Sequence, residues 1–139
     1  MSYDLVVFDP TVAPSSRGEF EQWFGKITEW EEPRDYNVPD PCSPSLKSWY
    51  LDMILKFPAM NGPYAKRADS IDDPAVSDYC ITERLIYVAF AWSKALAAYE
   101  ACFSLAAKHG LGFFDVSGEK GEVWLPDVRG NLSIASTSA

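Results

Sequence analysis

The most continuous apolar stretch of the chain, residues 85–92, has hydrophobic side chains at both odd and even positions. It is also rich in β-branched and aromatic residues, a combination typical of a strand with both faces covered. A bend near Thr82-Glu83-Arg84 would bring Tyr79–Ile81 back beside this stretch as a hairpin. The pattern therefore predicts a central strand.

Residues 94–109 continue with a helical pattern, in which apolar side chains recur every three or four positions. Ser93 precedes this pattern as a suitable N-cap, and Gly110 follows it as a residue that readily adopts the left-handed conformation at a helix end. Small alanines beside the apolar stripe would let the helix approach a sheet closely. The predicted buried stripe consists of Leu96, Tyr99, Phe103 and Ala106.

Two short apolar runs, 112–116 and 122–125, lie on either side of a segment that contains Gly118 and Gly121. Glycines between two such runs are typical of a β-hairpin, so we expect the runs to be antiparallel neighbours. Pro126 should end the second run, because proline has no backbone N–H to donate to the ladder.

The first half of the chain predicts one strand and two helices. Residues 3–8 are strand formers, whereas residues 17–31 carry apolar side chains at helical spacing. Four prolines occupy the loop 33–44, and a second amphipathic helix is expected over residues 44–58.

The predicted elements follow the order β-α-α-(β)-β-α-β-β, where the bracketed strand is Tyr79–Ile81. This order favours an α+β fold, a single layered sandwich in which a four- to five-stranded, mixed or mainly antiparallel sheet packs with three helices. We expect one domain over residues 1–129. Residues 130–139 are small and polar, which predicts a disordered tail.

Acidic residues outnumber basic ones, and the excess is uneven. The chain of 139 residues has a net charge of −8, and its first forty positions hold nine acidic and three basic residues. An acidic surface repels nucleic acid and attracts basic partners, although the same charge also serves solubility. We therefore expect a basic protein partner and no binding of nucleic acid.

Several features bear on the compartment. No apolar run approaches the length of a membrane span, and the chain begins with a strand-like segment rather than a signal peptide. Cys42, Cys80 and Cys102 form no C-x-x-C pair and are odd in number, which favours free thiols. These features predict a cytoplasmic protein that does not associate with membranes.

Side chains suited to catalysis are sparse. His109 is the only histidine, and its place at a predicted helix end favours a capping or solvated role over a metal site. The sequence contains no glycine-rich phosphate loop and no nucleophile elbow. Three carboxylates remain, Asp9, Asp115 and Glu122, and a pair of them could perform acid–base chemistry if buried together. The sequence therefore predicts no catalytic residue, metal or cofactor.

Of the five tryptophans, Trp30 alone stands among acidic residues, at the predicted end of a helix. The helix dipole disfavours carboxylates there, and an arrangement that costs stability suggests a function. Tryptophan is also enriched in protein interfaces, although Trp30 could instead cover the last helical turn. We predict a partner-binding site, the acidic patch, that consists of Glu29, Trp30, Glu31, Glu32 and Asp35. The other tryptophans fall on apolar faces and are expected in the core: Trp23, Trp49, Trp92 and Trp124.

Four motifs resemble a family of small, largely uncharacterised bacterial proteins, and the resemblance extends to about Pro126. The motifs are Met1–Leu5 with Phe8-Asp9-Pro10, Trp30-Glu31-Glu32, Met60-Asn61-Gly62-Pro63-Tyr64-Ala65, and His109–Val116 with the sequence HGLGFFDV. Some members of this family are similar to immunity proteins of polymorphic toxin systems. The motifs carry no established chemistry, so the resemblance implies no catalytic residue.

Two functions fit these observations. The first is a non-enzymatic protein-binding domain and, following the resemblance, an immunity protein that neutralises a basic bacterial toxin, because complementary charge speeds association. The second is a small-molecule-binding protein or minor enzyme with a pocket between helices and sheet, rimmed by Asp9, Trp30 and Asp115. A deep pocket with paired buried carboxylates would favour the second.

Overall fold

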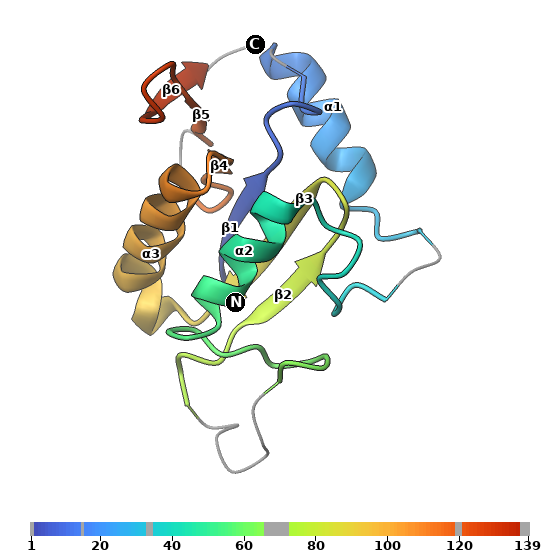
Figure 1. Cartoon of the computed structure of the whole chain (residues 1–139), viewed down its shortest axis with the longest axis vertical. Coiled ribbons are helices and arrows are strands. Elements are labelled where there is room, and N and C mark those ends of the chain that lie inside the picture. Colours follow the sequence, from blue (N-terminus) through green and yellow to red (C-terminus); the bar gives the residue numbers. More distant parts are fainter. Residues whose placement is uncertain (1, 15, 33–34, 66–72, 119–120, 137–139) are drawn as a thin grey trace.

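A computed structural model describes residues 2–14, 16–32, 35–65, 73–118 and 121–136 (Figure 1). These ranges contain three α-helices, six strands and a short 3-10 helix. In chain order the elements are β1 (Tyr3–Phe8), α1 (Arg17–Ile27), α2 (Pro44–Met53), β2 (Asp78–Ile81), β3 (Leu85–Phe90), η2 (Trp92–Lys94), α3 (Ala95–Lys108), β4 (Gly112–Phe114), β5 (Val123–Pro126) and β6 (Leu132–Ser136). The predicted α+β fold is confirmed.

The six strands form one sheet in the order β2-β3-β1-β4-β5-β6, and every neighbouring pair is antiparallel. Both predicted hairpins are present, as β2–β3 and β4–β5. β1 lies between β3 and β4, and its Val6 pairs with Tyr87 on one side and with Phe114 on the other. Since β3 and β4 are both antiparallel to β1, they run parallel to each other, and α3 makes the crossover between them.

The alternation of side chains along β1 divides the core into two clusters. Leu5 and Val7 belong to the larger cluster, which α2 and α3 cover, and both are 1% exposed. Val6 and Phe8 point the other way into a smaller cluster with α1. Figure 1 shows α2 and α3 in front of the sheet and α1 at the upper right. Helices therefore pack on both faces of the sheet.

The helix α3 differs from the prediction at its first turn. The 3-10 turn η2 takes up Ser93, and Lys94 occupies the N-cap position of α3 without a side-chain hydrogen bond. The buried residues of α3 are Ala98, Ala101, Cys102 and Ala106. Leu96 is 75% exposed, so the predictions of Ser93 as N-cap and of Leu96 as a core residue are wrong. The predicted helix end is confirmed, because Gly110 has a φ of +68°.

The C-terminal segment also differs from its prediction. Leu132–Ser136 form β6, which pairs with β5 at the edge of the sheet, so a disordered tail over these residues is wrong. Leu132 and Ile134 stand at alternate positions of this strand, and Leu132 packs against the larger core cluster, but the small polar residues around them hide this short strand pattern. The last predicted tail positions, 137–139, lie outside the described residues.

Three further findings concern the sequence predictions. Cys42, Cys80 and Cys102 are all free. In the described part of the chain, no helix has the length and apolar character needed to cross a bilayer. Trp49 is fully buried, as predicted. Trp92 is 49% exposed, so the prediction that Trp92 lies in the core is wrong. The ring of Trp92 packs beside Tyr3 at a centroid distance of 5.0 Å.

Candidate functional site

The helix α1 ends at Ile27, earlier than the predicted Glu31. The hydroxyl of Thr28 donates a hydrogen bond to the carbonyl of Phe24 over 2.8 Å and closes the last turn. Glu29 and the acidic residues after it therefore lie beyond the helix, in the loop that follows. The unfavourable helix dipole expected from the sequence acts on them less strongly there, because it falls off within the last turn.

Trp30 stands out by its backbone conformation. Its φ of +56° is the only positive φ at a non-glycine position in the described ranges. Bulky side chains rarely adopt this region, and such strain persists only where the surroundings enforce it. The backbone N–H of Trp30 donates to the carbonyl of Ile27 over 3.3 Å. The chain thus turns sharply at Trp30, directly after α1.

Two tyrosines hold the half-buried ring of Trp30. The ring meets Tyr36 edge-on at a centroid distance of 5.2 Å and Tyr87 of β3 at 5.9 Å. The hydroxyl of Tyr36 accepts a hydrogen bond of 2.9 Å from the backbone N–H of Glu32, which ties the loop back across the tryptophan. Trp30 is therefore fixed between the sheet and its own loop.

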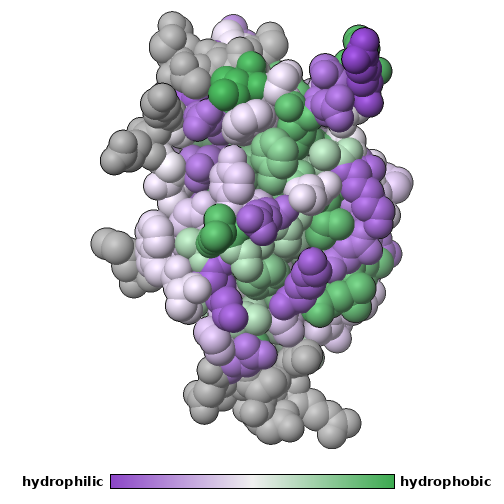
Figure 2. Space-filling model, turned by 90° about the vertical axis from the view of Figure 1, so that its left-hand side faces the viewer, coloured by the Kyte–Doolittle hydropathy of each residue, from purple (hydrophilic) through white to green (hydrophobic). Residues whose placement is uncertain are grey.

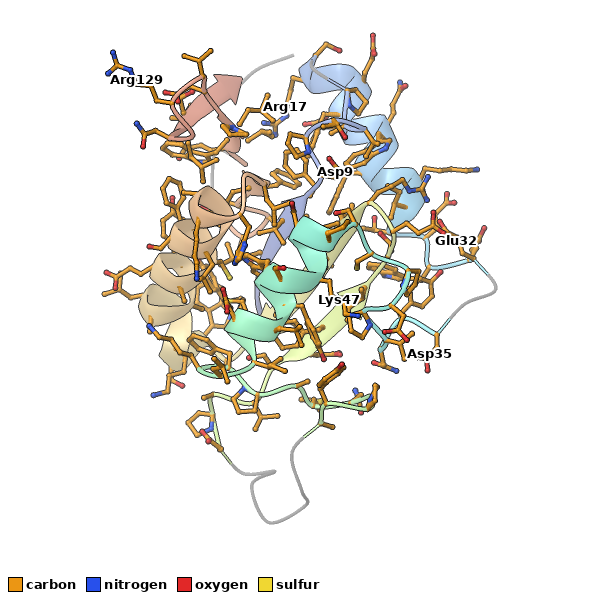
Figure 3. The ribbon with its side chains drawn as sticks, in the orientation of Figure 1. Asp9, Arg17, Glu32, Asp35, Lys47 and Arg129 are labelled. Carbon is orange, nitrogen blue, oxygen red and sulfur yellow. The ribbon has the colours of Figure 1, made fainter. Side chains whose placement is uncertain are left out.

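The acidic residues of the patch have different surroundings. Glu32 forms an ion pair with Arg84 over 2.5 Å, and Asp35 accepts a hydrogen bond from the backbone N–H of Asn37. Glu29 and Glu31 are exposed and have no ion pair within the described ranges. Figure 3 shows Glu32 and Asp35 on the same edge of the molecule. The structure thus places the predicted acidic residues close together along one loop.

A hollow of about 410 Å³ lies beside this loop. Its lining comprises Lys26, Ile27, Glu29, Glu31, Glu32 and Arg84. Two cationic side chains therefore stand among three carboxylates, so the patch is less negative than the sequence alone indicated. Within the described part of the chain, no group of three metal-ligating side chains gathers here or elsewhere.

Trp30 lines a different hollow, which we call the open-face groove. It has a volume of about 330 Å³ and lies on the face of the sheet that carries α1. Its lining comprises Phe24, Thr28, Trp30, Asp78, Cys80, Tyr87, Ala89 and Val116. Trp30 thus belongs to the groove, while the glutamates next to it in sequence line the other hollow.

The pKa values of two groups that line the open-face groove, the Tyr87 hydroxyl and the Cys80 thiol, are both raised. The Tyr87 hydroxyl donates a hydrogen bond to Asp4, and burial followed by this contact raises the pKa of Tyr87. Burial, with smaller contributions from Asp78 and Asp4, raises the pKa of Cys80 to about 11. The thiol is therefore protonated at neutral pH, and a role for Cys80 as a nucleophile is not favoured.

The structure does not bring Asp9 and Asp115 together. Asp115 follows Phe114, which pairs with Val6, whereas Asp9 follows Phe8 at the other end of this ladder. The two positions are roughly 13 Å apart along the strand direction. Asp9 binds the backbone N–H of the nearby Thr11, and Figure 3 shows it well away from Glu32. The pair of Asp9 with Asp115 is therefore not assembled.

Asp115 has its own environment near Tyr3 and Tyr99. Burial, opposed by a hydrogen bond from Gly118 and assisted by the charge of Glu122, raises the pKa of Asp115. Its Oδ1 atom is buried without a hydrogen-bond partner among the described atoms. Asp115 and the nearby Glu122 are both partly exposed, so they do not form the pair of carboxylates buried together that acid–base catalysis would need.

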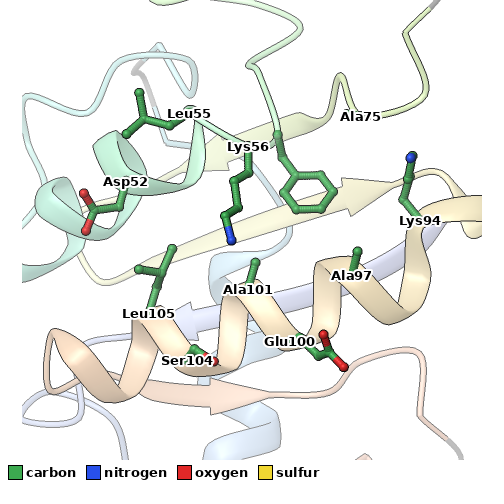
Figure 4. Close-up of a pocket in the computed structure, with 11 residues that line it drawn as sticks. Asp52, Leu55, Lys56, Ala75, Lys94, Ala97, Glu100, Ala101, Ser104 and Leu105 are labelled. Carbon is green, nitrogen blue, oxygen red and sulfur yellow. The ribbon is translucent and has the colours of Figure 1, made fainter.

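A larger hollow, of about 680 Å³, lies between α2 and α3 (Figure 4). Ala97 and Ala101 of α3 form part of its floor, and Lys56 and Lys94 contribute its positive charges. On the outer side of α3, Figure 2 shows hydrophobic side chains interspersed with hydrophilic ones. No sequence pattern predicted this hollow, because its walls come from segments far apart in the chain.

Asp52 closes one end of this hollow and joins α2 to the end of α3. Its Oδ2 lies 2.7 Å from Nε2 of His109 and 3.2 Å from Nζ of Lys108. Hydrogen bonds from these two residues, His109 first, lower the pKa of Asp52. His109 occupies the C-cap position of α3, one of the two roles expected from the sequence, and its side chain, which is 16% exposed rather than solvated, also links the two helices.

The fold and the site define an antiparallel α+β domain with an aromatic and acidic surface around Trp30. No protein-family model matches this chain, and no curated protein or solved structure is similar to it.

Proposed function

We propose that this chain is a non-enzymatic protein-binding domain, and that the acidic patch around Trp30 binds a basic protein. The observation that carries the proposal is the strained backbone of Trp30, with a φ of +56°, next to the exposed carboxylates of Glu29 and Glu31. Strained residues of this kind gather at sites where a ligand is bound. An aromatic anchor beside unpaired charges has the composition of an interaction hot spot.

The surroundings of Trp30 support this proposal, because they restrict its side chain before any partner arrives. Tyr36 and Tyr87 contact the ring from two directions. A side chain that is already ordered loses little conformational entropy on binding. The carboxylates of Glu29 and Glu31 would then steer a basic partner toward the ring.

Within this class, we propose that the protein acts in the cytoplasm as an immunity protein that neutralises a basic toxin. Its support is the net charge of −8 and the motif resemblance described above. Inhibition by such a protein requires only that it cover the basic surface of the toxin, so the scarcity of catalytic groups is compatible with this role.

The test is the rate at which the protein associates with a candidate toxin encoded by an adjacent gene. We expect Glu31→Lys to slow association by roughly three- to tenfold at low salt, because steering depends on the local charge. The difference should shrink in 0.5 M salt, where charges are screened over a few ångströms. Glu31 is the better position for reversal, because Glu32→Lys would also break the ion pair with Arg84.

Glu100→Lys provides the control, since Glu100 is an exposed acidic residue on α3. It makes the same change in net charge away from the acidic patch. If Glu31→Lys and Glu100→Lys slowed association equally, the result would contradict the acidic patch as the interface. A toxin that stays fully active in the presence of the wild-type protein would contradict the immunity function itself.

A small-molecule-binding protein is the second candidate. The observation in its favour is the hollow between α2 and α3, whose volume of about 680 Å³ lies in the range of ligand sites. The pocket proposed from Asp9, Trp30 and Asp115 does not support it, because the ladder of β1 and β4 separates the two carboxylates.

A further inference from the structure

The register of three strands produces a regular arrangement of charge at the open-face groove, in which Asp78 and Ala89 line the groove and Asp4 lies beside it. Asp4 of β1 pairs with Ala89 of β3, and Ala89 pairs with Asp78 of β2. The three residues therefore form one cross-strand row, with the small alanine in the middle. Neighbouring strands lie about 4.8 Å apart, so the two aspartates are separated by roughly 10 Å across the row.

Aromatic side chains form the adjoining part of the groove. Tyr87 lies in the next cross-strand row, and Trp30 meets its ring edge-on at a centroid distance of 5.9 Å. Phe24 of α1 stacks on Tyr87 from another side at 6.3 Å. Rings of this kind attract cations at their faces, Trp most strongly.

The two aspartates of this row have no cationic partner within the described ranges. Hydroxyl groups of Ser2 and Tyr87 donate hydrogen bonds to Asp4, and Asp78 forms no ion pair there. No Lys or Arg occurs among the residues described as lining the groove. Burial is the main cause of the raised pKa values of Tyr87 and Cys80, and the negative charges of Asp4 and, for Cys80, Asp78 add to it.

We propose that the open-face groove binds one Lys or Arg side chain of the basic partner. The cationic group would lie over Ala89 between Asp4 and Asp78, and the methylene groups would lie along Trp30 and Tyr87. The partner in this inference rests on the proposed function, whereas the cation site itself is defined by the groove. Trp30 would then join the groove to the acidic patch in one continuous interface.

The test uses short peptides in place of the unidentified partner: acetyl-Gly-Lys-Gly-amide, its Arg analogue, and a norleucine analogue without charge. Each is titrated into the ¹⁵N-labelled full chain and followed by NMR. We expect saturable shifts of the Trp30 indole N–H and the Ala89 amide with the Lys and Arg peptides. Norleucine, with a side chain of similar shape, should give no saturable shift.

A matched pair of variants locates the charge that is responsible. Asp78→Asn should weaken binding of the cationic peptides about two- to fivefold, as the loss of one partly exposed charge contact does. Glu100→Gln removes the same charge on α3 and should leave binding unchanged. Equal shifts with norleucine, or an Asp78→Asn affinity equal to that of the wild type, would overturn the inference.

These outcomes separate the two proposals. Peptides that do not bind, together with slowed toxin association in Glu31→Lys, would overturn the cation groove and leave the proposed function standing. If the peptides bind as expected but Glu31→Lys associates with the toxin as fast as the wild type, the results would support the groove and contradict the acidic patch.

Discussion

Trp49→Ala should lower the free energy of unfolding by about 3–5 kcal/mol, in the range found when a large aromatic core residue is truncated. Trp49 is 0% exposed and belongs to the core cluster that α2 and α3 share. Its indole N–H also donates to the carbonyl of Cys102 in α3 over 3.3 Å. The substitution would leave a cavity at the junction of the two helices and remove the hydrogen bond that joins them.

Urea denaturation of the variant measures this loss. Trp92→Ala provides the control, because Trp92 is 49% exposed and contacts the edge of the core only. Its expected loss is below about 1 kcal/mol, typical of a surface position. Similar losses for the two variants would contradict the packing described for α2 and α3.

Gly112→Ala should also destabilise the protein, by roughly 1–3 kcal/mol or more, through overpacking. A Cβ atom at position 112 would lie 2.2 Å from Cζ and 2.3 Å from Cε2 of Phe8. Phe8 is 0% exposed, and its ring packs against Phe20 of α1 at 5.1 Å. The ring therefore has no free space into which it could move.

Gly25→Ala provides a control of the same chemical type. A Cβ atom at Gly25 would meet no other atom within 4 Å, and the position lies in the exposed part of α1. Alanine should stabilise a helix there by about 0.5–1 kcal/mol relative to glycine. Gly112→Ala should thus lower the urea midpoint and Gly25→Ala should raise it. A midpoint that rises in both variants would contradict the contact between Gly112 and Phe8.

The predictions from the sequence succeeded where the signal is local. β1, the two hairpins and the left-handed Gly110 follow from alternation and glycine positions within a few residues. They failed where contacts between distant segments decide the outcome. β6 forms because β5 offers a free edge, and Leu96 is exposed because α3 turns its alanines toward the sheet.

The candidate site shows the same division. Its acidic residues and Trp30 are neighbours in the sequence, so a local sequence pattern could predict them. The ion pair of Glu32 with Arg84 joins residues 52 positions apart. The row of Asp4, Ala89 and Asp78 depends on the register of three strands. No local pattern contains that information.

The most direct measurement of Trp30 as a binding anchor is the dissociation constant of the complex with the adjacent-gene toxin candidate, for the wild type and Trp30→Ala. Trp92→Ala serves as the control for losing an exposed tryptophan, and circular dichroism confirms that both variants stay folded. We predict that Trp30→Ala weakens the complex roughly 30-fold or more, as expected for a hot-spot residue, and that Trp92→Ala leaves it unchanged. A folded Trp30→Ala variant that binds as tightly as the wild type would contradict the proposal that Trp30 anchors the interface.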